Sequence, residues 1–488
     1  MVNVLNYEDI NLKCGLEIHR QLNTSHKLFC GCSTNMIEKK PITEIKRKLH
    51  PVASELGEVD VAAQYEFLRN RQFNYQVFHG ENCLVECDEE PIHLLNQEAL
   101  EIALQVALLF NCIIPEEIHI MRKTVIDGSN TSAFQRTMVI GLNGFIEYKG
   151  KKIEILHVSL EEDAAGLVEE KNGSVTYRLN RLSIPLVEIG TGLIVGYSPE
   201  EIQNIAYTIG MICRSTGKVK RGIGTIRQDV NVSIKGGQRV EIKGVQELGL
   251  LSKVIELEVQ RQLSLPRVEK ETRAALPDGT TKFTRPLPGA ARMYPETDIP
   301  PFKIEKTFIQ KIKKNLPEPW DKKLIRFKEE LKLSYDLANQ ILRSDYLNLF
   351  ESLTKKFKIN PSVIANVFVS TLKDLKKREN IPVENLIDED FEKLFELLET
   401  GKLVKESIPD ILSYKVKNPE IAMTEIIKKI GLEAISKEEL TKIVNDTLEK
   451  NKGQPLNKII GIVMSKVRGR IKSEEVAEIV KKEFEKVY

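Results

Sequence analysis

The first 300 positions alternate apolar and polar residues in a way that predicts a mixture of strands and helices. Period-two and β-branched runs indicate strands at 153–160, 175–180, 184–190, 223–234 and 239–245. Helical spacing of apolar residues predicts helices over 94–110 and 199–215. Ser198 is the expected N-cap of the second helix, with Pro199 in its first turn.

A proline-rich stretch then divides the chain. Prolines at 286, 288, 295, 300 and 301 argue against a regular element over 285–301, so we expect an ordered closing loop there. After it, Lys, Glu, Leu and Ile recur at helical spacing, and a second boundary falls near 417–419. We therefore predict an α+β protein with a β-rich domain at 1–302, a helical domain at 303–417 and a small helical tail domain at 418–488.

Composition narrows the class of protein. Of 488 residues, 41% are hydrophobic and 29% charged, which fits a folded globular protein and not a disordered one. No apolar run approaches the roughly 18 residues that a membrane span needs, and the first residues lack a basic start and an apolar core. We expect a cytoplasmic protein without a membrane contact. The seven cysteines indicate reduced thiols and not a disulfide framework.

Charge is unevenly distributed although its sum is only +2. Residues 301–488 hold 37 Lys and Arg against 31 Asp and Glu, whereas residues 1–300 hold 35 against 39. An acidic front and a basic back are consistent with chemistry at one end and a polyanion at the other. Two ordinary solvated surfaces would give the same balance.

Three stretches of the first domain gather acids on predicted strands. Period two places Glu17 and His19 on one face of a short strand, where they suit a divalent metal or a half-buried hydrogen bond. Glu161, Glu162 and Asp163 follow an apolar run, and a bulge or strand end would be needed to gather all three around Mg²⁺. The alternative for these three acids is a solvated turn.

The third stretch is a predicted hairpin. Arg227, Asp229, Asn231 and Ser233 alternate with valines, and Glu241 and Lys243 do so on the return strand. A three-residue loop at 236–238, with Ser233 opposite Glu241 and Asn231 opposite Lys243, would put both polar sets on one face. That face suits a nucleotide and a metal, or it is the solvent side of an amphipathic sheet.

Cations and thiols provide further candidates. Arg122 and Lys123 precede an Asp-Gly-Ser-Asn turn and suit phosphate, although most such turns are only turns. Four cysteines are candidates for a zinc site or for buried small hydrophobes: Cys30, Cys32, Cys83 and Cys87. Residues 451–470 carry five cations and no acid, including Lys466, Arg468 and Arg470, which suits a phosphate backbone.

Taken in order, these motifs closely resemble the GatB/GatE family of tRNA-dependent amidotransferase subunits, and its archaeal branch more than its bacterial one. The resemblance covers essentially the whole chain. It is carried by residues 15–19, 27–30, 54–60, 127–131, 160–164, 222–229, 240–244 and 285–298.

The resemblance implies a fold of β-rich cradle, helical domain and small YqeY-like tail, and a ligase activity. Such subunits use ATP and Mg²⁺ to phosphorylate the γ-carboxylate of glutamate on misacylated Glu-tRNA(Gln). Ammonia from a GatD-type, asparaginase-like glutaminase subunit then yields Gln-tRNA(Gln). By similarity the metal ligands and catalytic residues are Glu17, His19, Glu161, Glu162 and Glu241. By the same similarity, ATP or phosphate falls to Lys123, Arg227, Asp229, Asn231 and Lys243, and tRNA to the tail cations.

One departure affects the expected tRNA recognition. Family members usually carry a large inserted domain before the segment Glu-Thr-Arg-Ala-Ala, and residues 262–273 leave no room for it. The second cysteine pair of the bacterial zinc site is also missing. A non-catalytic tRNA-binding adaptor of the same fold is the alternative function, and it would show gaps in the acidic set.

Overall fold

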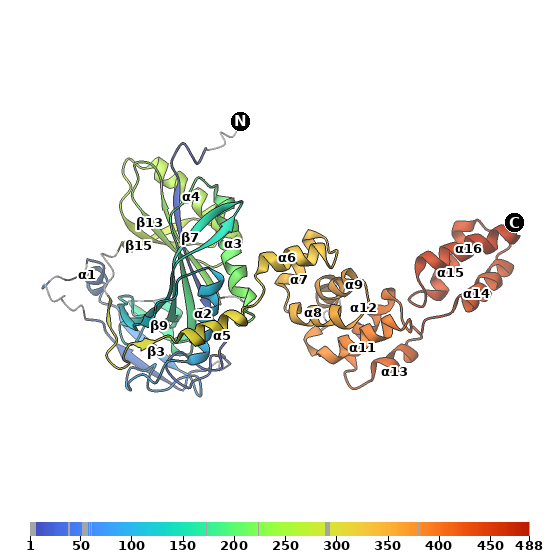
Figure 1. Cartoon of the computed structure of the whole chain (residues 1–488), viewed down its shortest axis with the longest axis horizontal. Helices are drawn as coiled ribbons and strands as arrows, with labels where there is room; N and C mark the ends of the chain where they lie inside the picture. The colour runs from blue at the N-terminus through green and yellow to red at the C-terminus, as the bar shows by residue number, and fades with distance from the viewer. Residues whose placement is uncertain are drawn as a thin grey trace. The chain divides into compact units, whose positions relative to one another are not determined.

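The computed structural model describes residues 6–37, 40–50, 57, 59, 61–171, 173–222, 224–287, 293–378 and 381–487. The chain forms two compact units, Met1–Pro319 and Trp320–Tyr488. The first unit is rich in strands and the second is helical (Figure 1), which confirms the α+β class. Most of the motif at 54–60 lies outside the described residues.

An eleven-stranded sheet forms the centre of the first unit. Its order is β15-β14-β13-β12-β1-β10-β7-β6-β5-β16, and β11 pairs with β1. The strands are β1 (Lys13–Gln21), β5 (Met121–Thr124), β6 (Phe134–Tyr148), β7 (Lys151–Glu162), β10 (Pro185–Thr191), β11 (Ile194–Val195), β12 (Ile226–Ser233), β13 (Val240–Val245), β14 (Glu271–Ala275), β15 (Thr281–Pro286) and β16 (Met293–Pro295).

Helices α2 (Gln97–Leu109), α3 (Pro199–Ser215) and α4 (Leu251–Ser264) cover the apolar face of this sheet. Leu16 and Ile18 of β1 and Val230 of β12 are buried against them, because their side chains alternate with the polar positions of the same strands. Helix α3 begins as predicted, since Ser198 and Glu201 form a capping box. The opposite face of the sheet is therefore left to polar side chains.

Smaller elements complete this unit. A second sheet of order β2-β3-β9-β8 and a two-stranded ribbon β17-β4 flank the main sheet. Their bounds, with the two remaining helices, are β2 (Thr43–Arg47), β3 (Gln72–Val77), β4 (Glu117–Ile118), β8 (Gly166–Lys171), β9 (Ser174–Arg178), β17 (Phe302–Lys303), α1 (Val61–Leu68) and α5 (Lys306–Lys314).

The second unit consists of short helices around two cores. One core runs from Leu324 to Ile427, past the boundary expected at residue 417, and the other from Ile435 to Val480. The three-part division of the chain stays a prediction. The helices are α6 (Trp320–Glu329), α7 (Tyr335–Arg343), α8 (Leu347–Lys356), α9 (Pro361–Asn366), α10 (Leu372–Arg378), α11 (Asp388–Glu399), α12 (Ile408–Lys417), α13 (Met423–Lys429), α14 (Lys437–Lys450), α15 (Leu456–Val467) and α16 (Ser473–Val487).

Two local predictions were wrong. Strands β12 and β13 pair with Asn231 opposite Glu241 and Val232 opposite Val240, so the three-residue hairpin is replaced by a longer connection whose register differs by two residues. A shift of two keeps the side chains on the same face, so the polar sets still coincide. The segment 285–301 is also not a loop throughout, since it ends β15 and forms β16; residues 288–292 of it lie outside the described residues.

Parallel pairing occurs between β13 and β14, with α4 as the crossover between them. The connection from the end of α4 to β14 is residues 265–270, of which only Val268 is buried. This short stretch is where the family resemblance places the missing inserted domain.

Candidate functional site

The polar face of the main sheet gathers most of the predicted site residues. Strand β1 lies between β12 and β10, and its His19 is opposite Arg227 on one side and Glu188 on the other. Paired residues share a face. By this register, five neighbouring strands contribute to one polar surface, which holds Glu17, His19, Glu161, Glu188, Arg227, Asp229, Asn231, Glu241 and Lys243.

A tight group of ligand atoms lies on the β1, β10 and β7 part of this surface. His19, Glu161 and Glu188 offer one nitrogen and two carboxylate oxygens within 4.8 Å of one another. His19 Nε2 is 3.1 Å from Glu188 Oε2, and Lys123 Nζ is 3.3 Å from Glu161 Oε1 and 3.4 Å from Glu188 Oε2. Both carboxylates are buried. This group has the composition of a divalent metal site with a lysine beside it.

The charges of this group depend on one another. Burial favours the neutral form of Glu188, but Lys123 and hydrogen bonds from His157 and His19 outweigh it and hold the Glu188 pKa well below its usual value. The charge of Glu161, opposed by burial and supported by Glu188, raises the pKa of Lys123. His157 Nε2 lies 3.0 Å from Glu188 Oε1, and this bond raises the pKa of His157.

A second group lies next to it on β1, β12 and β13. Asn231 Nδ2 donates to Glu17 Oε1 at 3.4 Å, and Lys243 Nζ lies 3.3 Å from Glu241 Oε1. Burial raises the pKa of Glu17, and the charges of Glu188 and Glu241 raise it further. Acids that raise one another's pKa in this way indicate a place where a cation would be stabilised.

Two buried polar atoms on this face support a metal. Among the described residues, His19 Nδ1 and Asp229 Oδ2 are buried and have no hydrogen-bond partner. Asp229 is nevertheless ionised more readily than usual, because Arg227 and His19 outweigh its burial and lower its pKa. An imidazole nitrogen and a carboxylate oxygen left without partners beside clustered acids are the donors that a divalent ion requires.

Glu162 and Asp163 are not brought to this face. Strand β7 is regular through Glu162, so its side chain points to the side opposite Glu161. Glu162 Oε2 accepts from the backbone N–H of Arg136 at 3.0 Å. Asp163, beyond the strand end, binds Arg181 at 2.9 Å. The strand end therefore separates the three consecutive acids.

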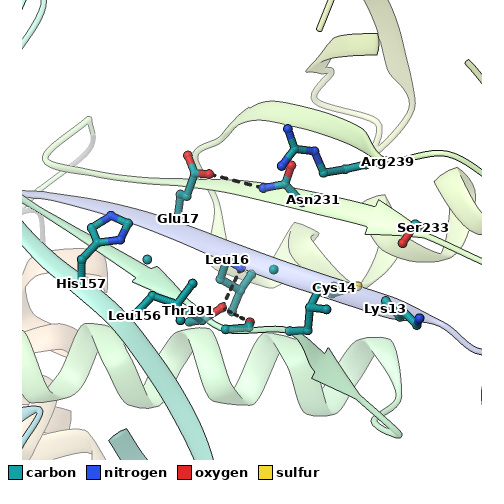
Figure 2. A pocket seen from close by; sticks show the side chains of 14 residues that line it. Lys13, Cys14, Leu16, Glu17, Leu156, His157, Thr191, Asn231, Ser233 and Arg239 are labelled. Atoms are coloured by element: carbon teal, nitrogen blue, oxygen red, sulfur yellow. Dashed lines mark hydrogen bonds between the residues drawn. The ribbon is translucent and has the colours of Figure 1, made fainter. Parts of the chain in front are cut away.

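A pocket of about 430 Å³ adjoins the acidic groups (Figure 2). Glu17, His157 and Asn231 border it, and the backbones of Gly15, Gly190 and Gly192 form part of its wall. A Cβ at Gly190 would lie 2.4 Å from the His157 ring, so glycine is needed there for space. A substrate can thus approach the sheet backbone next to the carboxylates.

Sequence analysis missed Glu188 and His157. Both carried a signal. Glu188 is the one acid in the apolar run of β10, and a carboxylate in a buried strand must be compensated by a partner. His157 shares the period-two face of Glu161 on β7.

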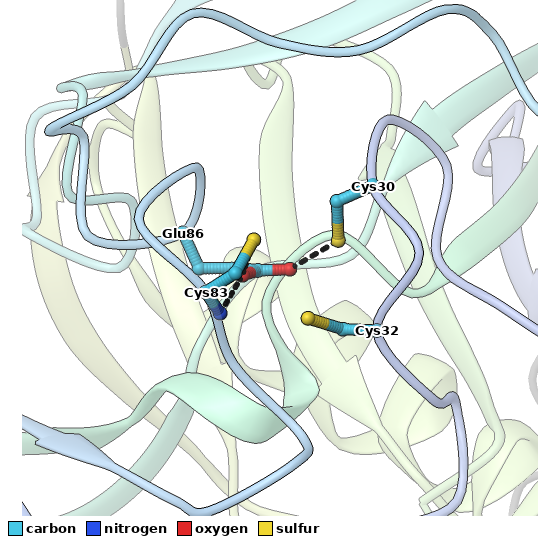
Figure 3. A group of neighbouring side chains, drawn as sticks. All are labelled: Cys30, Cys32, Cys83 and Glu86. Carbon is cyan, nitrogen blue, oxygen red and sulfur yellow. Dashed lines mark hydrogen bonds between the residues drawn. The ribbon is translucent and has the colours of Figure 1, made fainter.

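A third group is formed by thiols (Figure 3). Cys30, Cys32, Cys83 and Glu86 come from two loops and place their ligand atoms within 4.8 Å of one another. Glu86 Oε1 accepts from Cys30 Sγ at 2.9 Å and lies 3.1 Å from Lys27 Nζ, in a pair with no exposed side-chain surface. Hydrogen bonds from Cys30 and Cys32 lower the pKa of Cys83. The four side chains suit one metal ion.

The prediction of Cys87 as the fourth thiol was wrong. Cys87 is buried in the core of the smaller sheet beside Phe73 and Tyr75, and Glu86 takes its place in the group. The cause is local: the chain between Cys83 and Cys87 turns so that consecutive side chains face opposite ways.

Tail cations lie at the end of α15. Lys466 and Arg468 are exposed, and Arg470 is half-buried with its Nε donating to the carbonyl of Glu433 at 3.3 Å. In the described part of the chain, no helix has the length and hydropathy of a membrane span.

Comparison with known proteins identifies the class to which this fold and site belong, that of the tRNA-dependent amidotransferase subunits. A family model described as the GatB/GatE catalytic domain matches residues 12–310, and one described as the GatB domain matches residues 348–484. The chain belongs to the GatB/GatE family.

Curated relatives are similar over nearly their whole length. A Methanocaldococcus jannaschii protein, named as the E-type chain of glutamyl-tRNA(Gln) amidotransferase, is 38% identical over 587 positions, which cover 92% of this chain and 93% of that protein. Proteins of the same name from Saccharolobus islandicus strain L.S.2.15 and Methanococcus vannielii are 36% and 37% identical, over 92% and 91% of this chain and 92% of each relative. Since 587 aligned positions exceed 488 residues, the first relative contains residues without a counterpart here.

Proposed function

We propose that this chain is the synthetase subunit of a glutamyl-tRNA(Gln) amidotransferase. It phosphorylates the γ-carboxylate of glutamate on misacylated Glu-tRNA(Gln) with ATP and Mg²⁺, and ammonia then displaces the phosphate to give Gln-tRNA(Gln). The observation that carries the proposal is the row of acids and cations from five strands on one sheet face. The printed names of the relatives support the same substrate.

The chemistry explains why these side chains suffice. A carboxylate is a poor acyl donor, because its leaving group would be oxide, and phosphorylation replaces it with a good leaving group. Phosphoryl transfer needs positioning and charge neutralisation more than a covalent nucleophile. Magnesium, when bound, would neutralise phosphate oxygens and screen the clustered acids.

Each side chain then has a role. Glu17, His19, Glu161, Glu188 and Glu241 would hold the metal; Glu162 is left out because it faces Arg136 on the other side of the sheet. Lys123, Arg227 and Lys243 flank the acids and would bind phosphate oxygens. Asp229 and Asn231 orient neighbours: Asp229 Oδ1 accepts from the backbone N–H of Gly244 at 2.9 Å.

The remaining parts of the reaction follow the family. A GatD-type glutaminase subunit would release ammonia, with glutamine as the amide donor. The basic end of α15, with Lys466, Arg468 and Arg470, would contact the tRNA backbone. Translation takes place in the cytoplasm, where we place the protein.

A reconstituted reaction tests the proposal. Purified protein with Glu-tRNA(Gln), ATP, Mg²⁺ and ammonium should form Gln-tRNA(Gln). Glu161→Ala or Glu241→Ala should abolish phosphate release while tRNA affinity stays within a few fold. RNA binding without phosphate release by the unaltered protein would instead support the adaptor.

We also propose a structural Zn²⁺ held by Cys30, Cys32, Cys83 and Glu86. Thiolates are preferred zinc ligands, and a carboxylate oxygen is an accepted fourth one. The buried Lys27 lies beside Glu86 and would offset the net negative charge of three thiolates and a carboxylate around a divalent ion.

A further inference from the structure

Arg285 lies on the polar face of the sheet, beyond the residues assigned above. Strand β13 pairs with β14 so that Glu241 is opposite Thr272, and β14 pairs with β15 so that Thr272 is opposite Arg285. Thr272 Oγ1 donates to Glu241 Oε2 at 3.0 Å, which shows that the row shares a face. Neighbouring strands are about 4.8 Å apart. The Arg285 backbone is therefore about 10 Å from that of Glu241, and its long side chain extends the polar row.

Arg285 lacks a partner in the part of the chain that the structure describes. Its Nε is buried and makes no hydrogen bond, and none of the described carboxylates lies within ion-pair distance of it. A buried guanidinium N–H without an acceptor is costly, so a bound anion would be favoured.

The nearest carboxylates already have other partners. Glu241 is bound by Thr272 and lies 3.3 Å from Lys243 Nζ. Asp127, which Arg285 and Lys243 help to keep ionised at a lowered pKa after its hydrogen bonds from Ser129, has its Oδ1 bound by the Ser129 N–H at 3.0 Å and hydroxyl at 2.7 Å. Lys243 and Arg285 thus form a cationic end of the polar row, on the side of the acids opposite Lys123.

We propose that Arg285 binds a phosphate group of the substrate complex, together with Lys243. This inference rests on the proposed function, because it assigns the phosphate to the same site. The guanidinium fork matches two phosphate oxygens, which a lysine alone does not. The phosphate belongs to the nucleotide or to the end of the tRNA, and the two sources are separated by experiment.

Direct binding by the full chain tests the proposal without turnover. Binding of Mg·ATP is measured by isothermal titration calorimetry, and binding of a tRNA(Gln) transcript by filter assay over a salt series. The variants are Arg285→Gln and Arg285→Lys. The matched control is Lys253→Gln, which removes an exposed cation from α4 on the apolar side of the same sheet.

For a nucleotide phosphate, Arg285→Gln should weaken Mg·ATP binding by about 10- to 100-fold, the loss expected for a hydrogen bond to a charged group. For an RNA phosphate, the salt slope of tRNA binding should fall by about one. Arg285→Lys should recover part of either loss. A misfolded Arg285→Gln would lose both ligands and its cooperative melting transition, and the comparison of Arg285→Lys with the unaltered protein then takes its place.

The proposal is overturned if both ligands bind Arg285→Gln as tightly, and with the same salt slope, as they bind Lys253→Gln. It is supported, and the proposed reaction refuted, if Arg285 governs Mg·ATP binding but the unaltered protein never forms Gln-tRNA(Gln).

Discussion

Glu188→Gln is the most direct perturbation of the site, because one carboxylate serves three partners. Glu188 accepts from His157 at 3.0 Å and His19 at 3.1 Å and lies 3.4 Å from Lys123 Nζ. Breaking a buried ion pair by removing one partner costs about 3–5 kcal/mol. Here Lys123 keeps Glu161 at 3.3 Å and the histidines can be neutral, so we expect a loss of about 2–3 kcal/mol, near that of one or two charge-assisted hydrogen bonds.

The assay is urea unfolding of the full chain between pH 3 and pH 9, followed by circular dichroism. The pKa of Glu188 is depressed in the fold, so its contribution is present above the ordinary glutamate pKa and is lost as pH falls through the depressed value. The pKa of His157 is raised, so its contribution is present below the ordinary histidine pKa and is lost as pH rises through the raised value.

The unaltered protein should therefore lose stability at both ends of this range, and Glu188→Gln should show a flatter profile. Glu170→Gln, at an exposed carboxylate on β8, is the control for loss of a charge. A free energy of unfolding for Glu188→Gln within about 0.5 kcal/mol of the control at pH 7, the effect of an ordinary surface change, would refute the reasoning.

Three further predictions concern other parts of the chain. Cys30→Ser should lower the zinc content measured by atomic emission from one ion per chain toward zero, whereas Cys87→Ser should leave it unchanged; equal retention by both variants would exclude the thiol site. Neutralising Lys466, Arg468 and Arg470 together should reduce the salt slope of tRNA binding by about two to three, and an unchanged slope would remove the tail from the tRNA footprint. Gly128→Ala should cost about 1–3 kcal/mol more in unfolding free energy than Gly150→Ala, since both glycines have positive φ but only a Cβ at Gly128 would meet the Phe73 ring, at 2.2 Å; equal losses would contradict this.

The sequence predicted the polar face of the sheet because strand alternation is a local property. The residues Arg227, Asp229 and Asn231 lie on one side of β12 as their spacing indicated. Register is not local, and the β12–β13 pairing differed by two residues because the connection, not the side-chain alternation, sets it.

Partners across the sheet were also beyond the sequence. Nothing in the run Pro185–Thr191 says that Glu188 will face His19, because their contact depends on which strands become neighbours. In the same way, only the turn between Cys83 and Cys87 decides that Glu86 and not Cys87 joins the thiols.

The short connection between α4 and β14 has a consequence for how this family varies in size. Residues 265–270 leave a helix on the apolar side and enter a strand at the edge of the acidic surface, and apart from Val268 they are exposed. A whole folded module can be spliced in or out at such a place without breaking a strand pair, since loop closure grows costly only slowly with length. Recognition modules of different origin can be exchanged there as cassettes while the chemistry beneath them is inherited unchanged.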